Sequence, residues 1–281
     1  MLVFHWGYTV IVLYEQSQAV FCVAGVRLRL SLGKEAVEEK VWSLFAEAPG
    51  REPDVTFLAA GKASTDYQVE RYPLPAACRQ VFRYGQDVVL ADEGCRTCVL
   101  LPVTDPCSPM VLLNHVFYTH AVRRQMLQLH CATINDGGRG LLFLGPSGIG
   151  KTTQAERWAE FRGASIINGD VGFVQRTERE YIAWGTPWHG SSPYCLNASV
   201  PVKALVVLKQ ARENRLRELT GFEKVSEIAG SVFYPTWLED GMELCTDTLN
   251  HLLTDLPVYR LDNRADRESV EILAKELDRI T

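Results

Sequence analysis

The residues with the clearest chemistry form one glycine-rich stretch. Residues 145–152 read Gly-Pro-Ser-Gly-Ile-Gly-Lys-Thr and fill every fixed position of the phosphate-loop pattern, G-x-x-x-x-G-K followed by Ser or Thr. In such a loop the glycines let backbone N–H groups turn toward phosphate oxygens, and the following helix adds its positive end. Lys151 would bridge the terminal phosphates of ATP, and the Thr152 hydroxyl would hold Mg²⁺. The predicted nucleotide-binding residues are Gly145, Pro146, Ser147, Gly148, Ile149, Gly150, Lys151, Thr152 and Thr153.

The segments on either side give this stretch the setting that a phosphate loop needs. Residues 141–144 are a short apolar run typical of a buried strand, and residues 153–161 combine helix formers with apolar residues at helical spacing. The sequence therefore predicts a strand, the loop and a helix in that order. The alternative is a glycine-rich turn that matches by accident, and the agreement of all fixed positions and both flanks disfavours it.

Two further side chains are expected beside the phosphates. Asp170 follows the predicted strand 164–167, and ligands of α/β sheets gather beyond the carboxyl ends of strands. A carboxylate there can hold the metal or take the proton of the acceptor. His130 lies near the start of a β-run, 129–134, that the turn 135–140 joins to the loop's own strand, so a hairpin would bring His130 back to the phosphates. We predict Asp170, His130 and Lys151 as catalytic residues and Thr152 and Asp170 as metal ligands, with turn capping and packing as the alternatives for Asp170 and His130.

The composition limits the classes of function. The chain has 281 residues, 47% of them hydrophobic, which is enough for one large or two ordinary domains. Its net charge of −5 provides no global attraction for nucleic acid or for an anionic membrane. The eight cysteines are scattered and do not form a compact disulfide framework, and residues 1–14 lack the basic start of a signal peptide. We expect a cytoplasmic protein that binds neither nucleic acid nor membrane.

The pattern of elements predicts two domains. Residues 1–107 form a β-rich domain, with a hairpin of strands 9–14 and 19–24, further strands at 26–32, 55–59, 67–72, 80–84, 88–91 and 98–103, and a helix at 35–45. Residues 108–281 form an α/β domain that begins with a long apolar helix, 109–127, and has a strand buried on both faces at 203–210. Further elements are expected at 171–174, 181–184, 222–229, 241–253, 258–261 and 266–280.

Several other residue groups are given no role. Cys95 and Cys98 have the spacing of half a metal site or a redox pair, but no second pair accompanies them. His115 and His120 lie five residues apart on the predicted helix, hence on different faces, and packing is the better interpretation. A group of polar residues follows the strand 203–210 and could supply a guanidinium for phosphate, although no spacing singles one out: Arg212, Asn214, Arg215 and Arg217.

Residues 129–174 resemble the catalytic core of HPr kinase/phosphorylase and its relatives, which share their fold with ATP-dependent phosphoenolpyruvate carboxykinase. The resemblance implies an α/β fold with a mixed sheet and a phosphate loop. It also implies that His130 is an active-site histidine, that Lys151 and Thr152 hold nucleotide and magnesium, and that Asp170 is the second of two adjacent acids. Gly169 stands where the family has the first acid, its usual base. Either Asp170 serves both roles, His130 replaces the missing base, or phosphorylase activity is absent.

The loop 185–192 is the candidate acceptor site. It combines small residues, a proline and aromatic residues, and it resembles the loop that small HPr-kinase-like tailoring kinases place beside the acceptor. Thr186 and His189 are predicted to contact the substrate, with Trp188 as a wall of the pocket; plain packing is the alternative.

Three functions remain open at this point. The first is an ATP- and Mg²⁺-dependent kinase that phosphorylates a hydroxyl, most plausibly a Ser of a peptide or protein. The second is a nucleoside-monophosphate-type kinase, because the phosphate loop also resembles that of adenylate kinase, although that family begins its chain with the loop. The third is a non-catalytic, nucleotide-gated binding module in which Gly169 marks a lost base. The hexamers known among HPr kinases make a homo-oligomer plausible.

Overall fold

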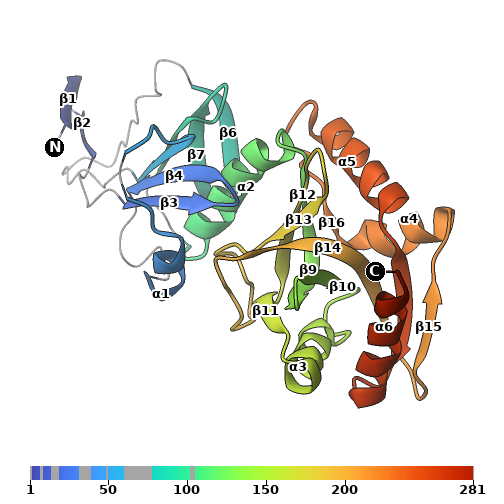
Figure 1. Cartoon of the computed structure of the whole chain (residues 1–281). Coiled ribbons are helices and arrows are strands. Elements are labelled where there is room, and N and C mark those ends of the chain that lie inside the picture. The colour runs from blue at the N-terminus through green and yellow to red at the C-terminus, as the bar shows by residue number, and fades with distance from the viewer. Residues whose placement is uncertain are drawn as a thin grey trace. The chain divides into compact units, whose positions relative to one another are not determined.

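The computed structural model describes residues 2–6, 9–13, 19–31, 39–48, 50–59, 78–101 and 105–280. The chain divides into two compact units, Met1–His120 and Ala121–Thr281 (Figure 1). Residue 107, where the sequence places a domain boundary, lies just before helix α2 (Ser108–Val122), and α2 continues past the end of the first unit. The strand predicted at 67–72 lies outside the described residues.

The first unit is mainly β-structure. Its elements are β1 (Leu2–Trp6), β2 (Thr9–Leu13), β3 (Ala19–Val23), β4 (Val26–Ser31), α1 (Glu39–Trp42), a 3₁₀ turn η2 (Ser43–Phe45), β5 (Val55–Ala59), β6 (Cys78–Tyr84), β7 (Asp87–Asp92), β8 (Thr97–Leu100) and most of α2. Six strands form one sheet in the order β3-β4-β5-β8-β7-β6, in which only the pairs β4–β5 and β5–β8 are parallel.

The predicted hairpin between residues 9–14 and 19–24 is wrong. β2 pairs with β1, which the sequence analysis did not predict, and β3 pairs with β4. The turn between β3 and β4 is Ala24-Gly25, with φ of 47° and 76°. Two residues of positive φ match the twist of paired strands, so this two-residue turn takes β3 to its neighbour in sequence.

The predicted helix 109–127 is too long. α2 ends at Val122, and β9 begins at Met126 after a three-residue turn in which Gln125 has a φ of 57°. Residues 126–129 are nearly all apolar, and a short apolar run fits a buried strand as well as a buried helix. Of the predicted helix 35–45, residues 35–38 lie outside the described residues, Glu39–Trp42 form α1, and Ser43–Phe45 form the 3₁₀ turn η2.

The second unit is α/β with mixed sheets, the fold class that the sequence predicts. Its elements are β9 (Met126–Asp136), β10 (Arg139–Leu144), α3 (Lys151–Arg162), β11 (Ser165–Asn168), β12 (Val171–Arg176), β13 (Tyr181–Trp184), β14 (Ser199–Gln210), β15 (Arg215–Glu218), α4 (Phe222–Ile228), η3 (Ala229–Ser231), β16 (Val232–Phe233), α5 (Gly241–Asp255), β17 (Val258–Asn263) and α6 (Arg267–Ile280). β1, β15, β16 and the 3₁₀ turns are absent from the prediction.

Two long strands connect the layers of this unit. β9 pairs with β12 through its first half and with β10 through its second half, and β14 likewise passes from β13 to β10 and β17. Because β12 also pairs with β13, and β14 pairs with β10, the strands β10-β9-β12-β13-β14 form a closed ring of pairings. A sheet that closes on itself has fewer unpaired edges, and the closed pairing fixes the positions of the strand ends relative to one another.

Helices α3 and α6 cover the β9-β10-β14-β17 layer. Their apolar side chains join one buried cluster with the strands, which includes Phe143, Trp158, Val206, Leu261 and Leu273. Trp158 is fully buried on α3, with its ring 6.3 Å from that of Phe143. Burying a large aromatic side chain contributes about 2–3 kcal/mol, so this contact fixes α3 on the sheet and with it the loop that precedes α3.

Candidate functional site

A tight hairpin places the amino-terminal half of β9 beside the end of β10. The two strands turn through Gly137-Gly138, both with positive φ, and the Asn135 side chain accepts a hydrogen bond from Gly138 N at 2.7 Å. The register pairs Leu144, the last residue of β10, with Cys131. His130 therefore lies next to the start of the glycine-rich stretch, in the position that the sequence predicts for it.

The glycine-rich stretch connects β10 to α3. Gly145, Gly148 and Gly150 have φ of 138°, 76° and 105°, values that side chains other than glycine rarely adopt. A Cβ added at Gly148 or Gly150 would meet nothing within 4 Å, so the loop is open at these two residues. No side chain caps the first turn of α3, which leaves its N–H groups available to an anion.

Lys151 is the first residue of α3 and folds back over the loop. Its ammonium donates to the carbonyl oxygens of Gly145 at 3.1 Å and Pro146 at 3.2 Å, and the residue is 6% exposed. Burial lowers the pKa of Lys151, while the nearby charges of Asp170 and Cys131 act in the opposite direction. The structure therefore brings Lys151 within electrostatic range of Asp170.

Asp170 lies at the junction of β11 and β12, on the far side of β9 from β10. Residues 133–135 of β9 pair with both β10 and β11, and both strands run antiparallel to β9, so their carboxyl ends lie at the same edge. The Thr152 hydroxyl donates to Gly169 O at 3.2 Å, and His130 Nε2 lies 3.0 Å from Asp170 Oδ1. Both side chains of the His130–Asp170 pair are about a quarter to a third exposed, so a ligand can reach them.

Asn168 has a role in this junction that the sequence analysis missed. Its side chain is fully buried, and its Oδ1 accepts hydrogen bonds from the backbone N–H groups of Asp170 and Val171, each at 2.9 Å. Its Nδ2 donates to the carbonyl oxygens of Thr186 at 3.2 Å and Trp188 at 2.9 Å. One amide thus ties Asp170 to the loop 185–192. The signal in the sequence is the Asn-Gly-Asp turn, since asparagine commonly bonds the backbone two residues on.

The loop 185–192 packs directly on the acid. A Cβ on Gly190 would lie 1.9 Å from Asp170 Oδ2, and a Cβ on Gly169 would lie 1.8 Å from Ser192 Oγ. Ser192 therefore fills the space that a side chain at residue 169 would take. The segment is held farther along by Tyr194, whose hydroxyl donates to Glu156 of α3 at 3.0 Å.

The two predicted substrate residues differ in their access to a ligand. Thr186 is fully buried, and its hydroxyl donates to Trp188 O at 3.4 Å inside the loop. His189 is partly exposed, and its Nδ1 contacts Ser192 O. The ring of Trp188 packs 6.3 Å from that of Phe173. Of the two predicted substrate residues, only His189 is accessible at the surface of the loop.

The oxygen atoms near the loop fit a magnesium ion that phosphates help to hold. Thr152 and Asp170 provide a hydroxyl and a carboxylate on adjacent segments, joined by the bond from Thr152 to Gly169 O. Among the described residues there is no group of three or more His, Cys, Asp or Glu side chains that could hold a metal. Mg²⁺ commonly binds through one or two protein oxygens plus substrate phosphates and waters, and it does not need a full protein cage.

The cysteine and histidine pairs singled out in the sequence lie in the first unit. Cys95 donates to Gln80 Oε1 and Cys98 to Cys95 O, and both thiols are buried. Burial raises the pKa of Cys98, which favours the neutral thiol. His115 contacts Val111 O at 2.7 Å and His120 contacts Cys95 O at 3.0 Å.

The fold and the site define an α/β protein of mixed sheets with a glycine-rich turn between a strand and a helix. The model of a family described as SynChlorMet cassette protein ScmC matches residues 97–261, more than half of the chain, and the chain belongs to this family. Comparison with the curated proteins gives no match. Part of the chain is similar to the Hpr(Ser) kinase/phosphatase from Coxiella burnetii, with 12% identity over 54% of this chain and 88% of that one. The TM-score between the two structures is 0.33. None of the helices in the described residues has the length and apolar character to cross a membrane.

Proposed function

We propose that this protein is an ATP- and Mg²⁺-dependent kinase that transfers the γ-phosphoryl group to the hydroxyl of a Ser in a peptide or protein. The observation that carries the proposal is the convergence of three elements on one loop. Lys151 lies on the loop itself, Thr152 bonds to the residue before Asp170, and Asp170 pairs with His130. Phosphoryl transfer requires these parts: a cradle for phosphates, a cation, and a carboxylate near the acceptor.

Each residue has a defined part in the reaction. The open amides at Gly148 and Gly150 and the start of α3 bind the phosphates, and Lys151 balances their charge. The acceptor oxygen bonds to the γ-phosphorus as the bond to the β,γ-bridging oxygen breaks, and ADP leaves. The acceptor's proton passes to Asp170, which His130 holds in place at 3.0 Å. Magnesium bound through Thr152 and Asp170 would neutralise charge on the phosphates.

One feature supports the class of the acceptor and a second supports its position. The resemblance of residues 129–174 to HPr kinase/phosphorylase favours a Ser of a protein or peptide. The loop 185–192 contacts Asp170 through Gly190, so the acceptor meets the acid beside this loop. With Gly169 in place of the first acid, Asp170 is the carboxylate at this junction that takes the proton.

The test is the Asp170→Asn variant. Turnover of ATP with a Ser-containing peptide is expected to fall by about 10²-fold or more, while the Kd for ATP changes by less than about tenfold, because general-base catalysis contributes roughly 10²–10⁴-fold. Asp247→Asn is the matched control, since Asp247 is exposed on α5 with a long contact to His251. Mass spectrometry of the peptide measures the added phosphate. Unchanged turnover in Asp170→Asn would remove Asp170 from the mechanism, and ATP binding without phosphate transfer to any peptide would favour a binding module.

A further inference from the structure

Three parallel strands end beside the phosphate loop. β10, β14 and β17 run parallel, with β14 between the other two, and β14 pairs with the edge of β10 opposite to β9. Their last residues are Leu144, Gln210 and Asn263. Gln210 Nε2 donates to Ile149 O at 3.4 Å, which joins the end of β14 to the loop. The turns after β14 and β17 therefore lie on the side of the loop away from His130 and Asp170.

The position of Asp170 indicates which end of a bound triphosphate lies on the β9 side of the loop. This step rests on the proposed kinase function. If Asp170 takes the acceptor's proton, the γ-phosphoryl group lies at the β9 side of the loop, where Asp170 contacts His130. A triphosphate is a linear chain, so its α-phosphate and nucleoside extend the other way, toward the ends of β14 and β17. The residues of those two turns are the ones that a ribose and a base would meet.

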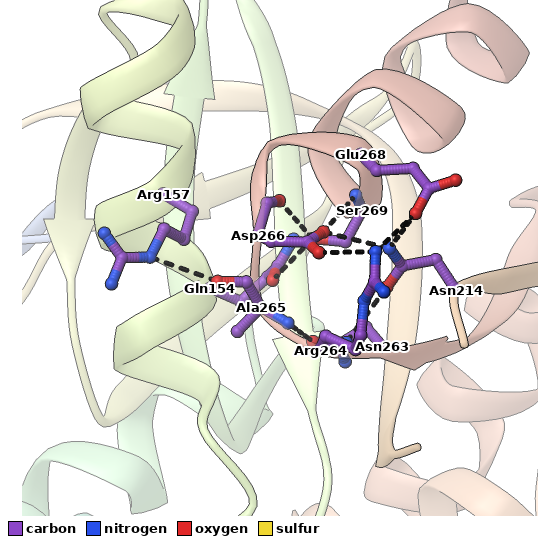
Figure 2. A network of polar contacts seen from close by, with 9 residues as sticks. All are labelled: Gln154, Arg157, Asn214, Asn263, Arg264, Ala265, Asp266, Glu268 and Ser269. Atoms are coloured by element: carbon purple, nitrogen blue, oxygen red, sulfur yellow. Dashed lines mark hydrogen bonds and ion pairs between the residues drawn. The ribbon is translucent and has the colours of Figure 1, made fainter. Parts of the chain in front are cut away.

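A polar network joins these two turns (Figure 2). Asn214 Nδ2 donates to Asp266 Oδ1 at 2.9 Å and Glu268 Oε2 at 2.7 Å, and its Oδ1 accepts from Arg264 N at 2.9 Å. Asp266 Oδ1 also accepts from Ser269 N at 3.1 Å in the first turn of α6. Burial opposes ionisation of Asp266, but the hydrogen bonds from Ser269 and Asn214 outweigh it and hold the pKa of this carboxyl below its usual value. The network keeps both turns in one arrangement without a ligand.

Arginines surround this network, and three of them are committed to the protein. Arg157 Nε donates to a carbonyl of the turn after β17 at 3.1 Å, and Arg264 pairs with two carboxylates of the network. Arg267 stacks on the ring of Phe161, with 4.6 Å from its guanidinium carbon to the ring centroid. Arg212, in the turn after β14, is exposed and forms no hydrogen bond or ion pair with the described residues. Its guanidinium is therefore available to a ligand.

We propose that residues 211–214 and 264–266 form the subsite for the nucleoside of the bound triphosphate, with Arg212 as its contact residue and Asn214 as the residue that positions the turn of Arg212. A guanidinium donates to ribose hydroxyls and base acceptors and stacks on the face of a base. Asn214 acts through its bonds to the turn after β17, so its loss displaces Arg212 without removing a ligand contact.

The test compares ATP with inorganic tripolyphosphate, which carries the three phosphates and lacks the nucleoside. Calorimetry in the presence of Mg²⁺ measures both ligands on the full chain. Arg212→Ala and Asn214→Ala are expected to weaken ATP by roughly tenfold and to leave tripolyphosphate unchanged, as loss of a charged hydrogen bond at a partly open site would. Arg215→Ala is the matched control. Arg215 lies three residues from Arg212 in the sequence, is exposed, and pairs with Glu213. It is expected to change neither ligand.

The outcomes separate the two proposals. If the wild-type chain binds both ligands and Arg212→Ala changes neither, the nucleoside subsite is refuted and the kinase function stands. An equal loss of both ligands in Arg212→Ala would also refute it, because Arg212 would then be a phosphate contact. If the wild-type chain binds neither ATP nor tripolyphosphate, the kinase function fails and the subsite fails with it.

Discussion

Gly169 and Ser192 share a space that holds one side chain. A Cβ on Gly169 would lie 1.8 Å from Ser192 Oγ and 2.6 Å from Ser192 Cβ. The φ of Gly169 is outside the left-handed region, so Gly169→Ala would be opposed by this contact and not by backbone strain. Ser192 cannot step aside freely, because its hydroxyl accepts from Tyr194 N at 3.3 Å. We expect Gly169→Ala to lower the free energy of unfolding by about 1–3 kcal/mol, the usual cost of overpacking.

A double-mutant cycle of Gly169→Ala and Ser192→Gly measures the energy of this contact as a coupling between their unfolding free energies. Ser192→Gly alone loses the hydrogen bond from Tyr194 N and adds backbone freedom, about 1–2 kcal/mol together. In the double variant the new methyl group occupies the vacated space, so its cost should equal that of Ser192→Gly alone. The coupling energy is then about 1–3 kcal/mol, well above the roughly 0.5 kcal/mol scatter of independent sites. Urea unfolding of the four proteins, followed by the fluorescence of the second unit's tryptophans, measures it.

If the losses in unfolding free energy of Gly169→Ala and Ser192→Gly simply add in the double variant, the two side chains do not compete for one space. The same geometry governs any attempt to place an acidic side chain at residue 169. Gly169→Asp places the same Cβ against Ser192, so it should fold poorly in the wild-type background and well beside Ser192→Gly. Equal stability of Gly169→Asp in both backgrounds would refute the reasoning.

Two further predictions concern buried groups of the same site. Asn168→Ala removes the Asn168 side chain from four backbone groups, of which only Thr186 O and Trp188 O keep another side-chain donor. It should lower the free energy of unfolding, measured in urea, by about 2–5 kcal/mol, and a change below about 1 kcal/mol would contradict the bridging role. Burial raises the pKa of the Cys131 thiol to about 12, so an alkylating reagent at pH 8 should modify exposed Cys107 in the native chain and Cys131 only after unfolding, as peptide mass spectrometry would show. Because this folded-state pKa exceeds the ordinary 9.0, the neutral thiol stabilises the fold below pH 9, and this contribution is lost as the pH rises toward 12.

Local signals predicted the centre of the site well. The strand, the glycine-rich stretch and the helix follow one another as expected, with α3 beginning at Lys151, two residues before the predicted helix 153–161. The hairpin of β9 and β10 was also predicted, because Gly137-Gly138 is a strong turn signal between two apolar runs. Both features depend on neighbours in sequence, and such patterns are visible without a structure.

Contacts between distant segments were beyond the sequence pattern. Nothing local indicates that Asn168 binds the carbonyls of Thr186 and Trp188, or that Ser192 occupies the space beside Gly169. The end of α2 was misplaced for a related reason: an apolar run such as 126–129 becomes strand here only because β12 and β16 pair with it. In these segments the secondary structure and the contacts depend on tertiary packing partners and not on the intrinsic propensity of the residues.

Each side of the glycine-rich loop 145–152 is held by one asparagine. Asn168 joins Asp170 to the loop 185–192, and Asn214 joins the turns at the ends of β14 and β17. Because Asn168 bonds both to Asp170 N and to the loop 185–192, movement of that loop relative to Asp170 would break these hydrogen bonds, so we expect the loop and the acid to keep one arrangement. In the proposed kinase, disturbing Asn168 should therefore change turnover and the KM of the acceptor together. Disturbing Asn214 should change mainly the KM of ATP, since among the described residues its network has no direct hydrogen bond to Asp170 and reaches the acid only through α3.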